Sequence, residues 1–492
     1  MDDIPVAGDI DQVVHDIYII TVEAERIGLH LNEKKCEIIF PEGASKPNLG
    51  VFKDYQVVSP EDSFLLGAPL ITGSSVNRAL SDKHKDLQRA VERLKRIDAH
   101  DALTLLKNSL HAPRLLYILR TSECHDNNIL CDIDNLVRDG LTNILNIEIS
   151  DNQWLQATLP VGDGGLGVRS VASLASSAFL ASAVSTNELQ TKILSHTVIN
   201  EDISRDATLL SWTNATNSEP LDGTEASHQK NWDRVGITMV KAKLISDCQS
   251  EREKASILAS QAPHSGDWLH ALPITSCGLR MDFNTVRAAV GFRLGTRMCL
   301  PHTCSCGKEI DAYGIHCLAC KRSAGRHMRH NIINDIIFRS FAKAGISAVR
   351  EPMGLDRTDK KRPDGVTLMV WQQGKCLLWD ATVPDTLCET YRKKTAQEAG
   401  SAAELAATNK KTKYNNLMDK YIFVPVAIET LGPINMEGME FLKMLGQKIS
   451  DKTNDKRETS FLFQRISVAI QCGNASSFLG SFGDIAGIDC LD

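Results

Sequence analysis

The sequence predicts a multidomain α+β protein, with a mostly helical N-terminal half and an α/β domain towards the C-terminal end. Residues 76–150 place apolar side chains at intervals of roughly three and four residues, which is typical of amphipathic helices. Residues 365–382 have the pattern of two strands around a turn at Gln373–Gly374. A cysteine–histidine cluster at 304–320 lies between these two patterns and indicates a metal-binding module.

Composition is that of an ordinary globular protein, with 42% hydrophobic and 24% charged residues among 492. The net charge is −6, but positive residues concentrate in 321–330, 357–362 and 392–420, so local basic patches are expected. The sequence has neither a signal-peptide pattern nor an apolar run long enough to cross a bilayer, so no membrane partner is expected. The 14 scattered cysteines indicate reduced thiols and an intracellular location.

Changes of pattern along the chain predict six segments. In order, they are a short first segment at 1–75, a helical region at 76–198, a polar linker without periodicity at 199–230, a helical connector at 231–298, a zinc module at 299–330, and an α/β domain at 331–492. Within the helical region, Pro113 predicts a bend or break. The glycines of 159–170 predict a tight turn rather than a phosphate-binding loop, because no lysine with Ser or Thr follows in the required pattern.

The cysteine–histidine cluster has the spacing C-x-C-x9-H-x3-C. Three thiolates and one imidazole suit a closed, structural zinc site, and the four expected ligands are Cys304, Cys306, His316 and Cys320. Cys317 could replace His316 or Cys320 as a ligand. The alternative interpretation is a set of small buried residues in a loop-rich segment.

Basic residues follow the cluster immediately and run into a helix with an apolar face. Arg326, Arg329 and His330 are expected to contact a nucleic-acid backbone. The alternative is that this charged run is only a solvated helix face.

Two aspartates flank the predicted strand pair. Asp364 precedes the first strand, and Asp380 lies near the end of the second, where a regular hairpin would place it opposite position 367. An aspartate within an apolar strand is costly to bury unless it is paired or bound to a metal. Two convergent carboxylates predict a Mg²⁺ site. The alternative has Asp364 in a turn and Asp380 in a salt bridge with a lysine.

These motifs resemble a known nuclease family. Arg362-Pro363-Asp364 with Asp380-Ala381-Thr382 resembles the PD-(D/E)XK pattern, specifically the restriction-like endonuclease of site-specific non-LTR retrotransposons. In that family a cysteine–histidine cluster precedes the nuclease, and Arg329-His330-Asn331 matches a further motif. The resemblance implies a restriction-endonuclease-like fold at 331–492 with Asp364 and Asp380 as catalytic, magnesium-binding residues.

One position departs from the standard pattern, because Thr382 stands where a catalytic lysine is usual. In the retrotransposon enzymes this role belongs to a following helix with a Lys-x-x-Lys-Tyr pattern, which Lys410, Lys413 and Tyr414 match. The resemblance therefore implies Lys413 as the catalytic lysine and Lys410 as its alternate. A basic, solvated helix end is the competing interpretation for each lysine. Arg362 and Tyr414 are further expected contacts of nucleic acid.

The N-terminal half resembles the reverse transcriptase of the same elements. Asp2 and Asp3 would end its aromatic-x-Asp-Asp motif, and 28–39 and 64–70 resemble the motifs that follow. The resemblance implies a truncated palm at 1–75 and a thumb at 76–198. Two-metal phosphoryl transfer also needs an upstream aspartate, so no polymerase activity is expected from this chain alone. From the residues alone, Asp2 and Asp3 are a solvated terminus and a helix cap.

The expected function is therefore magnesium-dependent nicking of DNA, with Zn²⁺ in a structural module and DNA and the element's RNA as partners. A nuclear location follows from a DNA target. The alternative is a non-catalytic nucleic-acid-binding remnant of the same element. A competent polymerase is the third interpretation.

Overall fold

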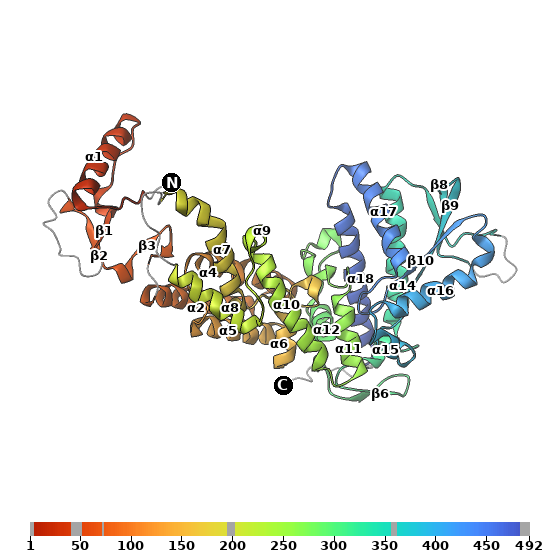
Figure 1. The fold of residues 1–492 in the computed structure, drawn as a ribbon. Helices are drawn as coiled ribbons and strands as arrows, with labels where there is room; N and C mark the ends of the chain where they lie inside the picture. Colours follow the sequence, from red (N-terminus) through yellow and green to blue (C-terminus); the bar gives the residue numbers. More distant parts are fainter. Residues whose placement is uncertain (1–3, 41–51, 71–72, 194–201, 356–361, 483–492) are drawn as a thin grey trace. The chain divides into compact units, whose positions relative to one another are not determined.

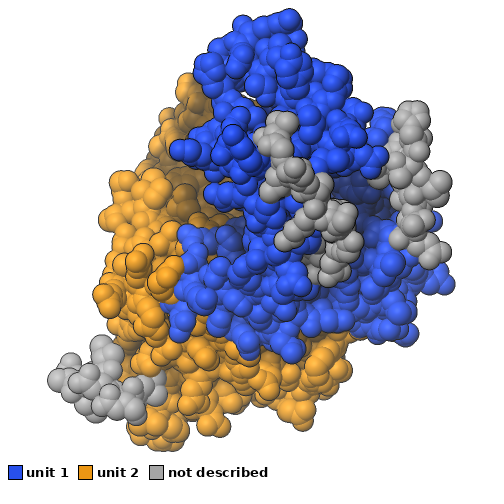
Figure 2. Space-filling view, turned by 90° about the vertical axis from the view of Figure 1, so that its left-hand side faces the viewer, with its two compact units in different colours: residues 1–88, 113–134, 171–235 blue, residues 89–112, 135–170, 236–492 orange. Residues whose placement is uncertain are grey.

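The computed structural model describes five stretches of the chain, which are 4–40, 52–70, 73–193, 202–355 and 362–482 (Figure 1). The described chain divides into two compact units, coloured separately in Figure 2. Unit 1 contains 1–88, 113–134 and 171–235, and unit 2 contains 89–112, 135–170 and 236–492. The predicted α+β class is confirmed, because helices dominate and the strands form small sheets.

Unit 1 is built mainly of helices. Its elements are α1 (Ile10–Arg26), η1 (Glu33–Lys35), β1 (Glu37–Ile39), β2 (Gln56–Val58), η3 (Pro60–Asp62), β3 (Phe64–Leu65), β4 (Ala68–Pro69), α4 (Ala112–Thr121), α7 (Val171–Ile193), α8 (Ile203–Thr216) and α9 (Gly223–Ala226). Among the described helices, α4 shares its first residue with unit 2, and three others also contribute residues to both units, namely α2 (Ser74–Leu94), α5 (Asn128–Leu145) and α10 (Gln229–Ser246).

The segment 199–230 is not the long loop that its polar composition predicts. Its described residues contain α8 and α9. Trp212 of α8 packs edge-on against Trp232 of α10, with ring centroids 4.8 Å apart. The sequence pattern missed these helices because only a few apolar residues hold them, and their partner lies outside the segment.

Unit 2 carries the predicted C-terminal domain. Its helices are α3 (Ala99–Leu105), the π-helical η4 (Leu106–Leu110), α6 (Asp151–Ala157), η5 (Val161–Asp163), α11 (Glu251–Gln261), η6 (Asp267–His270), η7 (Thr275–Cys277), α12 (Phe283–Leu294), α13 (His316–Ala319), α14 (Ala324–Lys343), α15 (Glu389–Thr395), α16 (Ser401–Lys413), η8 (Asn415–Leu417), α17 (Met436–Thr453) and α18 (Glu458–Leu479). The expected interruption near Pro113 is confirmed, because η4 ends just before it.

The strands of unit 2 form two sheets. β5 (His302–Thr303) and β6 (Glu309–Ile310) make a small hairpin. The larger sheet has the order β10-β9-β8-β7 and contains β7 (Ala348–Arg350), β8 (Gly365–Gln372), β9 (Lys375–Thr382) and β10 (Ile422–Ala427). β8 runs antiparallel to both of its neighbours, β7 and β9, whereas β10 runs parallel to β9. A parallel pair needs a crossover connection, which α15 and α16 supply.

The main core of unit 2 lies between one face of this sheet and α14, α17 and α18 (Figure 1). Trp379 of β9 and Phe341 of α14 are fully buried there, with ring centroids 5.0 Å apart. The opposite face of the sheet packs against α16 and the residues that follow it. Among the described residues, no helix is long and apolar enough to cross a membrane.

Candidate active site and metal centre

The β8–β9 hairpin brings the two predicted aspartates together. Gly365 of β8 pairs with Trp379 of β9, so Asp364, one position outward, lies opposite Asp380. A regular hairpin would instead place Asp380 opposite Thr367. The register shifts within the hairpin correct that expectation, because bulge-like irregularities change which residues oppose one another.

Gly365 is required at this position by the indole of Trp379. A Cβ added at Gly365 would lie 2.0 Å from the ring carbon Cη2 of Trp379. The indole is itself fixed, because its N–H donates to Oδ1 of Asn334 at 3.1 Å. Any larger residue at 365 would therefore push apart the strands that hold the two carboxylates.

Side-chain alternation along β9 directs Asp380 towards α16. Its neighbours Trp379 and Ala381 both belong to the core beneath α14, α17 and α18. Successive side chains of a strand point to opposite faces, so Asp380 points to the other face of the sheet. Val366 of β8 packs on that same face, against Tyr414.

Asp364 is held by a backbone N–H and by a histidine. Its Oδ2 atom accepts from the backbone N–H of Ala381 at 2.7 Å and lies 3.2 Å from Nε2 of His330. Burial raises the pKa of Asp364, but the hydrogen bond and charge of His330 and the N–H of Ala381 outweigh burial and hold it below its usual value. The hydrogen bond to Asp364 in turn raises the pKa of His330. The sequence assigned His330 only to nucleic-acid contact.

Asp380 is almost fully buried and forms an ion pair with Lys410 of α16. Burial raises the pKa of Asp380, and the nearby charge of Asp364 raises it further. Lys410 and Tyr414 act in the opposite direction. The site therefore combines two carboxylates, a lysine and a histidine, which come from the residue before β8, from β9, from α16 and from α14.

The structure distinguishes the three lysines at the end of α16. Lys410 pairs with Asp380, whereas Nζ of Lys411 pairs with Glu437 at 2.6 Å and points elsewhere. Nζ of Lys413 lies 4.5 Å from the ring centroid of Tyr414. Lys410, the alternate in the sequence prediction, is the lysine whose described ion pair reaches Asp380.

The five residues expected to contact nucleic acid differ in exposure. Arg326 and Arg362 are exposed, and the His330 side chain is 40% exposed. Arg329 and Tyr414 are buried, which corrects the expectation for these two. The guanidinium of Arg329 is bonded inside the protein, and the Tyr414 hydroxyl donates to the backbone oxygen of Arg362 at 2.7 Å.

A buried acid, Glu429, lies just beyond β10 and supports α16. Its Oε1 atom accepts from the backbone N–H groups of Ala402 and Ala403, at 3.0 and 3.1 Å, in the first turn of that helix. Burial raises the pKa of Glu429 to about 7. Nothing in the sequence linked Glu429 to α16, which precedes it in the chain.

The four predicted zinc ligands converge. Cys304, Cys306, His316 and Cys320 each present a ligand atom, and all four atoms lie within 4.8 Å of one another. Sγ of Cys306 is 3.1 Å from Nε2 of His316, and the sulfurs of Cys304 and Cys320 are 3.7 Å apart. Three thiols and an imidazole at these separations can bind Zn²⁺.

The local fold around the cluster explains how the ligands converge. Cys304 directly follows β5, and His316 and Cys320 lie at the start and just after the end of α13. Gly307 has φ of 87°, a conformation that most side chains avoid, which permits the turn after Cys306. Cys317 is not among the four residues whose ligand atoms converge. It is buried, and burial raises the pKa of its thiol to about 12.

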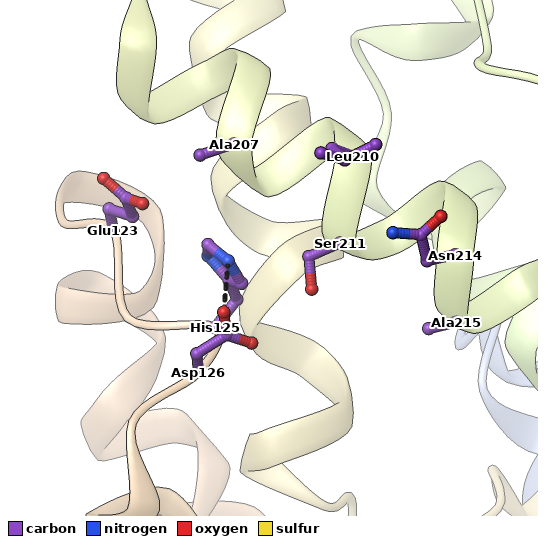
Figure 3. Close-up of a pocket in the computed structure, with 8 residues that line it drawn as sticks. All are labelled: Glu123, His125, Asp126, Ala207, Leu210, Ser211, Asn214 and Ala215. Atoms are coloured by element: carbon purple, nitrogen blue, oxygen red, sulfur yellow. Dashed lines mark ion pairs between the residues drawn. The ribbon is translucent and has the colours of Figure 1, made fainter.

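Unit 1 contains a separate pocket of about 670 Å³. Figure 3 shows His125 and Asp126 below α8, which contributes Ser211 and Asn214 to the lining. Nε2 of His125 lies 3.1 Å from Oδ2 of Asp126. None of the predicted site residues lines this pocket. The polymerase-like aspartates, Asp2 and Asp3, lie outside the described residues.

Comparison with known proteins gives one informative match. No protein-family model matches the chain. Over 345 residues, 67% of this chain, it is 23% identical to the retrotransposable element SLACS 132 kDa protein of Trypanosoma brucei gambiense. The match covers 24% of that protein, so the chain spans about a quarter of the relative's length. This similarity supports an origin of the chain in a retrotransposable element.

Proposed function

We propose that this chain is a metal-dependent DNA endonuclease of a non-LTR retrotransposon, which nicks DNA by hydrolysing a phosphodiester bond. The observation that carries the proposal is that the β8–β9 hairpin sets Asp364 opposite Asp380, close enough for its charge to act on Asp380, and that Lys410 forms an ion pair with Asp380. Asp364 and Asp380 are the two acids that the motif resemblance implies, and Lys410 is its alternate for the catalytic lysine. The similarity to a retrotransposable-element protein adds support from outside the site.

Asp364 and Asp380 are the residues that would hold Mg²⁺, which prefers carboxylate oxygens. They fit this ion because the two negative charges lie close enough for Asp364 to raise the pKa of Asp380, and a cation would relieve their repulsion. Bound Mg²⁺ would stabilise the charge that develops on the scissile phosphate.

The remaining residues have distinct roles in the proposed hydrolysis. A water oxygen bonds to phosphorus, one phosphorus–oxygen ester bond breaks, and the water's proton is carried to the leaving oxygen or to solvent. Lys410 provides the ammonium that orients the water and offsets the phosphate charge. His330 keeps Asp364 ionised and oriented by its contact at 3.2 Å. Exposed Arg326 and Arg362 contact the DNA backbone.

We further propose that the cysteine–histidine cluster holds a structural Zn²⁺ ion. All four of its donors are protein atoms, which leaves no ligand position for a substrate and suits a structural rather than a catalytic site.

The test is nicking of supercoiled plasmid by the full chain, with Mg²⁺ and with a chelator in its place. Magnesium-dependent conversion to the relaxed form is the expected result. DNA binding that weakens with salt, without any nicking, would instead support the non-catalytic binding protein.

A further inference from the structure

Arg329 is enclosed where α13, α14 and α18 meet, and it is 1% exposed. Its Nη2 atom donates to the backbone oxygen of Leu318 in α13 at 2.7 Å. Its Nη1 atom donates to Oδ1 of Asn474 at 2.9 Å and to Oγ of Ser477 at 3.1 Å, both in α18. Burying a cation is costly unless it forms hydrogen bonds within the protein. The contacts of this guanidinium with α13 and α18 offset that cost.

Two glycines make room for Arg329 at the crossing of α14 and α18. A Cβ added at Gly473 would lie 2.1 Å from Cγ of Arg329. One added at Gly325 would lie 2.3 Å from the backbone oxygen of Gly473. The helices therefore approach closely, and the arginine stem fills the space that a side chain at 473 would occupy.

The contact to Leu318 acts on the metal centre. Leu318 lies between two members of the cluster, His316 and Cys320, in a helix only four residues long. Such a short helix has little stability of its own. Fixing its Leu318 carbonyl therefore restricts where the flanking imidazole and thiol can lie.

Arg329 is also adjacent in the chain to a residue of the proposed nuclease site. The next residue of α14, His330, contacts Asp364, whereas Arg329 itself reaches back to α13. Asn474, one of its partners, donates in turn to the backbone oxygen of Thr430 at 2.7 Å, next to Glu429. One arginine thus joins the cysteine–histidine module to the core of the C-terminal domain.

We propose that Arg329 is a positioning residue for zinc binding, which holds α13 so that His316 and Cys320 are presented to the ion. The inference rests on the proposed zinc site. It assigns Arg329 to the interior of the protein, in place of the nucleic-acid contact that its sequence motif suggested.

The test measures zinc affinity of the full chain by competition with a chromophoric chelator. Arg329→Met should bind Zn²⁺ about 10- to 100-fold more weakly, as found when partners that orient metal ligands are removed. Arg329→Lys should lose less, because its ammonium can still donate to the Leu318 carbonyl. Arg326→Met is the matched control, since it removes an exposed arginine of the same helix and should leave the affinity within twofold.

A second control separates positioning from general destabilisation. Phe341→Leu weakens the core that α14 forms with the sheet and does not touch the zinc module. If it lowers Tm as much as Arg329→Met and weakens zinc binding equally, the proposal is overturned. If Arg329→Met does not fold, Arg329→Lys decides, and an affinity equal to that of the wild type overturns the proposal.

Zinc binding by the wild-type protein separates a failure of the zinc site from a failure of the positioning role of Arg329. Zinc binding by the wild type with no change in either Arg329 variant would refute the positioning role alone. Absence of zinc binding by the wild type would refute the zinc site and the positioning role together, whatever the outcome of the nicking assay.

Discussion

Lys410 of α16 forms an ion pair with Asp380 of β9, although 30 positions separate them along the chain. Of the three neighbouring lysines, Lys410 is the one whose described ion pair reaches Asp380. The pair also depends on the position of α16, which connects β9 to β10 in the chain and packs against the sheet. The candidate site therefore exists only in the folded domain.

The two aspartates give the most direct prediction. Asp364→Ala and Asp380→Ala should each lower the plasmid-nicking rate by at least about 100-fold, because each removes an oxygen ligand and a charge that orients the site. Asp419→Ala, at an exposed position of the same unit, is the control and should nick at the wild-type rate. Undiminished nicking by both site variants would place the catalytic carboxylates elsewhere.

The lysines provide a prediction that distinguishes Lys410, which the ion pair indicates as the catalytic lysine, from Lys413, which the sequence motif indicates. Lys410→Ala should lower the nicking rate by about 100-fold, since it removes the cation beside Asp380. Lys411→Ala, which removes a lysine paired with Glu437, should change the rate less than about threefold, because exposed ion pairs contribute little. A loss confined to Lys413→Ala would show that the motif, rather than the ion pair, identifies the catalytic lysine.

The close packing of Gly365 predicts a cost in stability. Gly365→Ala should lower the free energy of unfolding by about 1–3 kcal/mol, because its Cβ would overlap the Trp379 ring. Gly236→Ala is the matched control, since its added Cβ meets open space within α10 and should be neutral or stabilising by up to about 1 kcal/mol. Urea denaturation of both variants measures the difference. Equal stabilities would show that the hairpin can open around the indole without cost.

Glu429 predicts a pH dependence of stability. Burial raises the pKa of Glu429 from its ordinary value of 4.5 to about 7 in the folded protein. Folding therefore favours the protonated form of this carboxyl group. The contribution of Glu429 to the free energy of unfolding is therefore fully present below pH 4.5 and is lost as the pH rises through about 7. This contribution amounts to about 3 kcal/mol at most.

Glu429→Gln should remove this dependence, because glutamine stays neutral. The stability of the variant relative to the wild type should rise between pH 5 and pH 7.5, as measured by urea denaturation at each pH. Asp385 also faces Glu429 and is present in both proteins, so it does not create the difference. A constant difference between the two proteins across this range would contradict the raised pKa.

Local sequence patterns predicted much of the fold and part of the site. Helical periodicity predicted the helices of 76–150, and a strand–turn–strand pattern predicted β8 and β9, because both signals lie within contiguous segments. The zinc-ligand spacing predicted a cluster whose four ligand atoms do converge. All four ligands fall within one short stretch, so the chain has little freedom to separate them.

Long-range packing decided what the local patterns could not. The bulges of β8 set Asp364 opposite Asp380, and the path of α16 brought Lys410 to Asp380. The crossing of α14 and α18 turned Arg329 inward. By itself, the sequence determined which residue types were available and where helices and strands could form. Only the tertiary structure decided which side chains meet, because these contacts join segments that are distant in the chain and whose partners no local pattern specifies.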